Sequence, residues 1–192
     1  MAQNSGYCIA ADLYKGENPN GTRPGDQGLG ESVVLTFCDS LMKLFPGIQF
    51  SFYSEFFFTS IKLISSSEKG MKGTGTTRMN RMGKCPIADK KVMQKLYTEE
   101  NKGISTVAWR DNNMVYTLSN EHGVQSVQYD NRYSFKEKKS LQVRQPNTIH
   151  KYNKLIMGGV DLLDNKISNY IIGIRGKKWY IPIAFWLFDV CD

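Results

Sequence analysis

Acidic residues, whose carboxylates can bind divalent metals, stand at two distant places in the sequence. Glu55 stands in an aromatic segment typical of a strand, and Asp161 with Asp164 follows about a hundred residues later at the predicted start of a helix. Carboxylates from a strand and from a distant helix are a recurrent way to hold two metal ions. Other interpretations remain open: Glu55 suits the polar face of a strand, and Asp-x-x-Asp at a helix start is usually favourable charge against the helix dipole.

A group of basic residues near the end of the chain is suited to binding phosphate. Arg175, Lys177 and Lys178 stand beside Trp179 and Tyr180, a mixture that fits phosphate contacts and stacking. The aromatic residues fit a hydrophobic core equally well. The run of residues 136–139 is typical of a solvated face.

Composition limits the class of protein. The chain has 192 residues, 41% hydrophobic and 22% charged, which fits one globular domain or a domain with an insertion. Its net charge of +7 favours an anionic partner such as nucleic acid, although a basic domain without such a partner has the same composition. The four cysteines form no CxxC pair, so neither a zinc site nor a disulfide framework is expected, and reduced thiols fit an intracellular protein.

No signal for secretion or for a membrane span is expected. The first residues are polar, and the apolar run 179–190 is too short for a bilayer and contains Pro182 and Asp189.

Hydrophobic periodicity predicts the elements that would position these residues. We expect strands at 7–14, 48–58 and 71–77, a hairpin of 105–110 with 114–118, and a third strand at 124–129. Helices are expected at 31–45, 59–67, 156–172 and 181–191. The pattern is α/β with a β-rich interruption.

Five segments resemble a known family in order and in wording. They are residues 55–60, 73–81, 150–154, 157–164 and 175–180. The chain resembles the piggyBac family of DDE transposases and the host genes descended from them. The resemblance implies an α/β fold, a truncated RNase H-like core with a β-rich insertion domain. It places the partial core at 1–83, the insertion at 84–148, and the returning catalytic-position helix and C-terminal helix at 149–192.

The resemblance also assigns site residues. DDE transposases cut and join DNA with three carboxylates that hold two Mg²⁺ ions. The family's first Asp is expected to be absent, since Asp12 matches a later, non-catalytic strand and is expected to be structural or solvent-facing. Glu55 stands where the family has its second Asp, Asp161 matches the third, and Asp164 follows on the same helix face. Glu55 and Asp161 are thus the implied metal ligands, and Mg²⁺ is the implied cofactor.

The resemblance places DNA-contacting cations after the last core strand, at Arg78 and Arg81. It implies DNA as a partner, bound weakly through phosphates, a homodimer as in the family, and a nuclear or intracellular location. A Cys/His-rich zinc-binding tail, often present in the family, is expected to be absent.

Two hypotheses about function follow. Glu for Asp extends the carboxylate by one methylene, and a shift of about 1 Å at a catalytic site can cost on the order of a hundredfold in rate. Together with the missing first Asp, this favours a catalytically inactive fragment or a domesticated DNA-binding remnant of a DDE transposase. The alternative is an active, metal-dependent DNA transposase domain.

Overall fold

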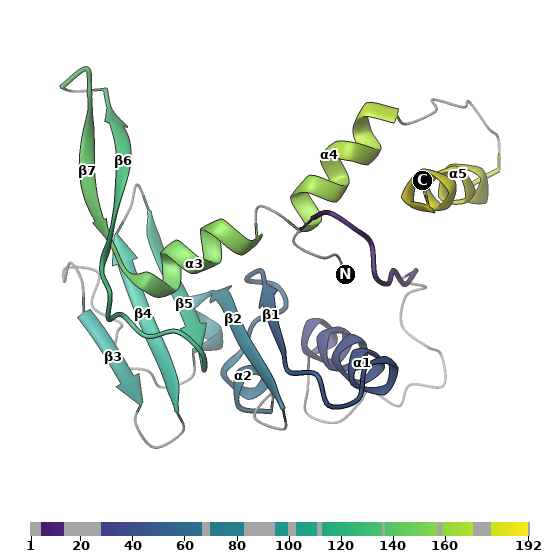
Figure 1. Cartoon of the computed structure of the whole chain (residues 1–192), viewed down its shortest axis with the longest axis horizontal. Helices are drawn as coiled ribbons and strands as arrows, with labels where there is room; N and C mark the ends of the chain where they lie inside the picture. Colours follow the sequence, from purple (N-terminus) through teal and green to yellow (C-terminus); the bar gives the residue numbers. More distant parts are fainter. Residues whose placement is uncertain are drawn as a thin grey trace. The chain divides into compact units, whose positions relative to one another are not determined.

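The computed structural model describes residues 5–13, 28–66, 70–82, 95–99, 103–110, 113–135, 137–156, 159–170 and 178–191 (Figure 1). The chain divides into two compact units, a larger one of residues 22–153 and a smaller one of residues 1–21 with 154–192. None of the described helices has the length and apolarity needed to cross a membrane.

A five-stranded mixed sheet forms the centre of the larger unit. Its strand order is β1-β2-β5-β4-β3, and the strands are β1 (Phe50–Ser54), β2 (Met71–Thr77), β3 (Lys95–Glu99), β4 (Ile104–Arg110) and β5 (Met114–Ser119). β1 and β2 are parallel and are joined through α2 (Ile61–Ser66), as a parallel pair requires a crossover. The remaining pairs are antiparallel. β5 is the neighbour of β2 on the side opposite to β1.

Helix α1 (Leu29–Leu44) precedes the sheet in sequence and ends before Pro46 and Gly47, which has φ +84°. Its N-terminal turn approaches the segment after β1 so closely that a Cβ on Gly30 would lie 2.6 Å from the carbonyl oxygen of Phe57. Side chains of α2, β4 and β5 form one apolar cluster of Ile64, Ile104 and Leu118. Phe52 of β1 packs against this cluster.

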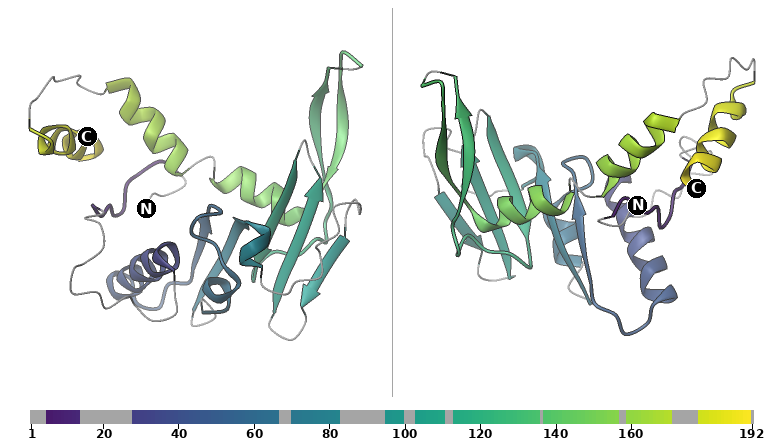
Figure 2. Two further views of the ribbon diagram at one scale, coloured as in Figure 1. Left: turned by 180° about the vertical axis from the view of Figure 1, so that it is seen from behind. Right: turned by 45° about the horizontal axis from the view of Figure 1, so that its top comes forward.

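A second, two-stranded sheet is formed by β6 (Gln128–Ser134) and β7 (Lys139–Gln145), which pair in antiparallel register. The hairpin is packed at its base, where Val143 joins the cluster of Val107, Trp109 and Ile149. It then extends beyond the five-stranded sheet (Figure 2). Helix α3 (Asn147–Ile156) follows directly and carries the buried Ile149.

The smaller unit contains α4 (Val160–Tyr170) and α5 (Tyr180–Cys191). The N-terminal segment packs on α4, because Lys166 Nζ donates a hydrogen bond to the carbonyl oxygen of Ser5 at 3.1 Å. Gly6, with φ +79°, lies against Leu162, and a Cβ there would be 3.0 Å from the Leu162 Cγ. Asp12 is exposed, as expected.

Several predicted elements are confirmed, with small shifts at their ends. They are α1, β2, the β4–β5 hairpin, α4 and α5. The strand predicted at 48–58 is shorter, because residues 56–58 form a turn after β1. The third strand of the insertion begins later than predicted, at Gln128, and β3, β7 and α3 were not predicted.

The strand predicted at 7–14 is wrong for the residues that the structure describes. Residues 7–13 contain only an isolated bridge at Cys8, and Tyr14 lies outside the described residues. A strand needs a partner as well as propensity, and this segment includes Ala10, Ala11 and Asp12, which favour strands weakly.

Candidate metal and nucleic-acid site

Glu55 lies directly after β1, in a tight turn held by its own backbone. Its carbonyl oxygen accepts hydrogen bonds from the amides of Phe58 at 2.9 Å and Thr59 at 3.1 Å. The buried hydroxyl of Thr59 lies 3.2 Å from the carbonyl oxygen of Ser54 and 3.0 Å from that of Glu55. The turn leaves the Glu55 side chain exposed. Backbone position is therefore fixed here, while the carboxylate faces solvent.

The two hydroxyl residues that follow have structural roles. Ser60 Oγ accepts the amide hydrogen of Leu63 at 3.0 Å, which satisfies a donor at the start of α2. Thr59 closes the turn, as described above. The Thr-Ser pair of this motif thus serves to start α2 and to place Glu55.

The glycines of β2 allow the neighbouring strand to approach. A Cβ on Gly75 would lie 2.3 Å from Thr59 Oγ1 and 2.6 Å from the carbonyl oxygen of Ser54. A Cβ on Gly73 would lie 2.4 Å from the ring of Phe52. Only glycine fits at these contacts, so the Gly-Thr-Gly spacing positions the end of β1 against β2.

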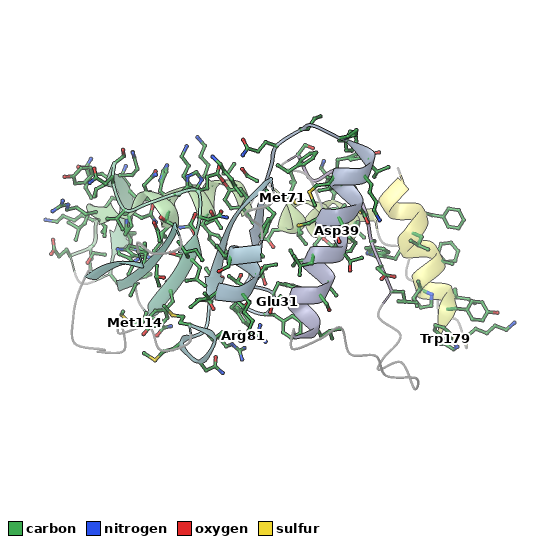
Figure 3. The ribbon with its side chains drawn as sticks, turned by 90° about the horizontal axis from the view of Figure 1, so that it is seen from below. Glu31, Asp39, Met71, Arg81, Met114 and Trp179 are labelled. Carbon is green, nitrogen blue, oxygen red and sulfur yellow. The ribbon has the colours of Figure 1, made fainter. Side chains whose placement is uncertain are left out.

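Arg78 and Arg81 extend from the end of β2 onto the turn that carries Glu55. The Arg78 guanidinium lies 4.5 Å from the centre of the Phe56 ring, and that of Arg81 lies 5.6 Å from the Phe57 ring. Arg81 also donates hydrogen bonds to the carbonyl oxygens of Phe57 and Phe56, the latter at 3.4 Å. Figure 3 shows Arg81 on the same side of the larger unit as Glu31, at the start of α1.

These contacts place cations and a carboxylate at one end of the sheet. Cation–π contacts of exposed residues contribute about 0.5–1 kcal/mol each, so they orient both guanidinium groups without burying them. Arg78, Arg81 and Glu55 are all exposed. Within the described residues, neither Arg78 nor Glu55 has an ion-pair partner.

Asp161 and Asp164 lie in the other unit, on the exposed side of α4. Leu163 and Ile167 form the buried side of this helix, and both aspartates are exposed. Asp161 stands in the first helical turn, where a negative charge is favoured by the helix dipole. Glu55 and the two aspartates thus come from different units of the chain.

The donor types partly fit the Mg²⁺ that the fold family implies. Exposed carboxylate oxygens of Glu55 and Asp161 are the hard donors that Mg²⁺ prefers. However, no group of three or more His, Cys, Asp or Glu side chains that could hold a metal gathers within the described part of the chain. No complete metal site is defined, and no chemical step through a metal follows from it.

Only part of the second basic group is described. Arg175 and Lys177 lie outside the described residues. Lys178 is exposed, with its Nζ 5.7 Å from the centre of the Tyr180 ring. Trp179, labelled in Figure 3, is 75% exposed and its ring lies 6.0 Å from that of Tyr180, so among the described residues neither ring is buried in a core. The stacking interpretation of Trp179 is the one that its exposure allows.

A polar cluster on β1 was missed by the sequence analysis. Tyr53 Oη lies 3.1 Å from Nε2 of His122, and Ser51 donates a hydrogen bond to Glu121 at 3.0 Å. Burial, with a smaller effect of the Glu121 charge, raises the pKa of Tyr53 to about 12. Burial lowers the pKa of His122 despite the opposing charge of Glu121. A local signal was lacking, because the residues are about 70 positions apart in sequence.

Glu31 was also missed. Its side chain is 6% exposed at the start of α1, and its Oε1 has no hydrogen-bond partner among the described residues. A negative charge in the first turn of a helix is favoured by the dipole, so the sequence alone indicates no more than that.

The parallel β1–β2 pair, with a carboxylate after one strand and arginines after the other, has the arrangement expected from the resemblance to transposases. A family model described as "Transposase IS4" matches residues 1–191. The human "PiggyBac transposable element-derived protein 3" is 38% identical over 96% of this chain. The chain therefore belongs to this family of piggyBac-type transposases.

Further comparisons agree on the family and on the fold. The human "PiggyBac transposable element-derived protein 2" is 33% identical over 84% of this chain. The chain spans 32% and 28% of the lengths of these two relatives. A structure of a piggyBac transposase synaptic complex with hairpin DNA matches 90% of this chain and 34% of its own, with a TM-score of 0.64 at 20% identity. The mixed α/β architecture is thus shared with a piggyBac transposase.

Proposed function

We propose that this chain is a DNA-binding remnant of a piggyBac-type transposase that does not cut or join DNA by itself. The observation that carries DNA binding is the pair Arg78 and Arg81, held on phenylalanine rings with exposed guanidinium groups. Guanidinium groups in a basic protein are suited to phosphate oxygens. The relative of known structure forms a complex with DNA, which supports the same partner here.

Further contacts would come from the second basic group. Lys178 is exposed beside Tyr180, and Arg175 and Lys177 precede it in sequence. Contacts of this kind neutralise phosphates and carry no sequence information. Binding is therefore weak, salt-sensitive and largely independent of sequence. The proposal includes a homodimer and a nuclear location, both taken from the family.

The proposal of inactivity concerns the carboxylates. Glu55 stands for the second family Asp and Asp161 for the third, with Asp164 beside it, and no residue of this sequence matches the first. The glutamate places its carboxylate one methylene further from a backbone that the Thr59 hydrogen bonds hold fixed. Mg²⁺ tolerates little displacement of its ligands, so a productive pair of ions is not held.

The proposed domain organisation follows the family. A partial RNase H-like core covers 1–83, a β-rich insertion covers 84–148, and residues 149–192 return to the core. The parallel β1–β2 pair with α2 between them supports the first part. The antiparallel strands β3 to β7 support the second.

Duplex binding tests the first half of the proposal. Fluorescence anisotropy with unrelated duplexes should give similar affinities and a linear fall of log K with log salt. Arg78→Ala should lower the slope by about one unit. Lys154→Ala, which removes another exposed cation, is the matched control for lost charge. Affinity that does not depend on salt, or that Arg78→Ala leaves unchanged, contradicts phosphate binding through this arginine.

Strand transfer tests the second half. The chain is incubated with pre-cut transposon ends and Mg²⁺ or Mn²⁺, and joined products are separated by electrophoresis. No joining is expected. Metal-dependent joining that disappears in Asp161→Ala would show the active alternative to be correct.

A further inference from the structure

The β6–β7 hairpin has two chemically different faces. Directly opposed residues of an antiparallel pair share a face, so Asp130 with Val143 and Arg132 with Leu141 lie on one side. This inner side packs at its base: Val143 joins the apolar cluster, and the Arg132 guanidinium lies 5.9 Å from the Trp109 ring.

The outer face is exposed along its full length and carries aromatic and polar side chains. Tyr129 is opposed to Arg144, Asn131 to Gln142, and Tyr133 to Ser140. Tyr129 and Tyr133 are 62% and 53% exposed. At the tip, Phe135 is 89% exposed and its ring lies 5.4 Å from that of Tyr133 at an angle of 88°. Leu141 and Val143 are partly buried on the inner face, whereas the aromatic rings of Tyr129 and Tyr133 on the outer face are exposed.

Charge indicates which partner fits this face. Five basic residues against two acidic ones leave residues 128–145 with a charge of +3. One basic residue, Lys139, is paired with Glu137 at 2.9 Å, whereas Arg144 lies beside Tyr129 on the outer face. A polyanionic partner is therefore favoured over an apolar protein groove.

We propose that the outer face of the β6–β7 hairpin binds single-stranded nucleic acid, with bases stacked on Tyr129 and Tyr133 and a phosphate held by Arg144. Alternate residues of a strand are about 6.6–6.8 Å apart on one face, so the two rings are separated by two such steps. Exposed rings beside cations on a sheet surface are a stacking platform for unpaired bases. The bases of a duplex are stacked on each other and unavailable to these rings, so the single strand is the occupant that uses both rings and charge. This goes beyond the phosphate contacts proposed above, which involve other residues.

The test compares three labelled nucleic acids by fluorescence anisotropy. They are an oligothymidylate of roughly 16 nucleotides, an abasic strand of the same length, and a duplex. In the double variant Tyr129→Ala with Tyr133→Ala, the affinity for oligothymidylate should fall. Each lost ring should contribute at least about a fivefold loss, because each removes one stacking partner. Tyr129→Phe with Tyr133→Phe should retain the affinity, because the rings remain. Tyr7→Ala removes an exposed tyrosine elsewhere and should have no effect.

The abasic strand separates stacking from charge. The two alanine substitutions should leave its affinity and that of the duplex within about twofold of the parent value, while Arg144→Ala should weaken both single strands. Equal losses on the abasic strand and on oligothymidylate, or no loss on either, overturn the inference. If duplex binding keeps its dependence on Arg78 in that case, the proposed function stands and only the hairpin inference fails.

Discussion

The residues that follow β1 and those in and after β2 carry both the family motif and the local structure. Thr59, Ser60, Gly73 and Gly75 fix the turn, start α2 and bring the strands together. The sequence indicated Glu55, Arg78 and Arg81 as site residues, and geometry adds that the arginines lie on the two phenylalanine rings after Glu55. That contact could not be predicted, because Arg81 lies 24 positions after Phe57 in sequence, with α2 and β2 between them.

Gly75 gives the first prediction at this scale. A methyl group there would meet Thr59 Oγ1 at 2.3 Å and the Ser54 carbonyl oxygen at 2.6 Å, and one of these contacts is backbone. Overpacking of this kind costs about 1–3 kcal/mol, so Gly75→Ala should lower the urea midpoint of unfolding. Gly123→Ala, whose added Cβ would meet its nearest neighbour at 3.9 Å, is the matched control. Equal midpoints for the two variants would contradict the close approach of β2 to the turn.

His122 gives a prediction about pH. Burial holds the pKa of His122 below its ordinary value of 6.5, with Lys151 and Lys72 acting in the same direction and Glu121 opposing them. The unfolded chain therefore binds more protons once pH falls below 6.5. The stability associated with neutral His122 is complete above that pH and is lost as pH falls towards the folded pKa. Urea unfolding across this range should show a falling free energy of unfolding.

The slope with pH is the measurement that isolates His122. His122→Asn should reduce the slope of the free energy of unfolding with pH. Loss of the Tyr53 contact lowers the free energy of unfolding by the same amount at every pH and does not change this slope. His150→Asn removes the other histidine of the chain and serves as the control. If the parent and the His122→Asn chain lose stability equally on acidification, burial of the His122 imidazole does not cause the pH dependence.

At the scale of elements, local signals predicted some structures and not others. α1, β2 and α5 have strong apolar periodicity or β-branched content, and each was predicted within a few residues. β3 lies in a polar, lysine-rich segment and exists as a strand through its pairing with β4. β7 depends on β6 in the same way, and the segment 7–13 lacks such a partner among the described strands. Pairing between distant residues is the information that single-sequence patterns do not contain.

The position of β1 leads to the prediction for this scale. Among the described strands, β1 pairs with β2 alone, whereas β2 lies between β1 and β5. Alternate amides of β1 should therefore exchange quickly, and the amides of Thr74 and Gly75 in β2, which pair with both neighbouring strands, slowly. Hydrogen exchange followed by NMR measures both strands in one sample. Uniform slow exchange along Phe50–Ser54 would show that another strand covers this edge.

The whole chain combines a net charge of +7 with exposed apolar side chains on α5, including Leu187 and Phe188. Exposed apolar patches favour association, whereas like charge opposes it. Salt reduces the repulsion, because the Debye length falls from about 10 Å at 0.1 M to about 3 Å at 1 M. We therefore expect self-association to increase with salt while DNA binding decreases.

Sedimentation velocity over a range of protein and salt concentrations measures this association. Leu187→Gln with Phe188→Gln should shift the chain towards the monomer and retain helix propensity. Leu13→Gln changes an exposed leucine outside α5 and should leave the association as it was. Association that weakens as salt rises would mean that charged contacts hold the copies together, and the apolar surface of α5 would then not be responsible.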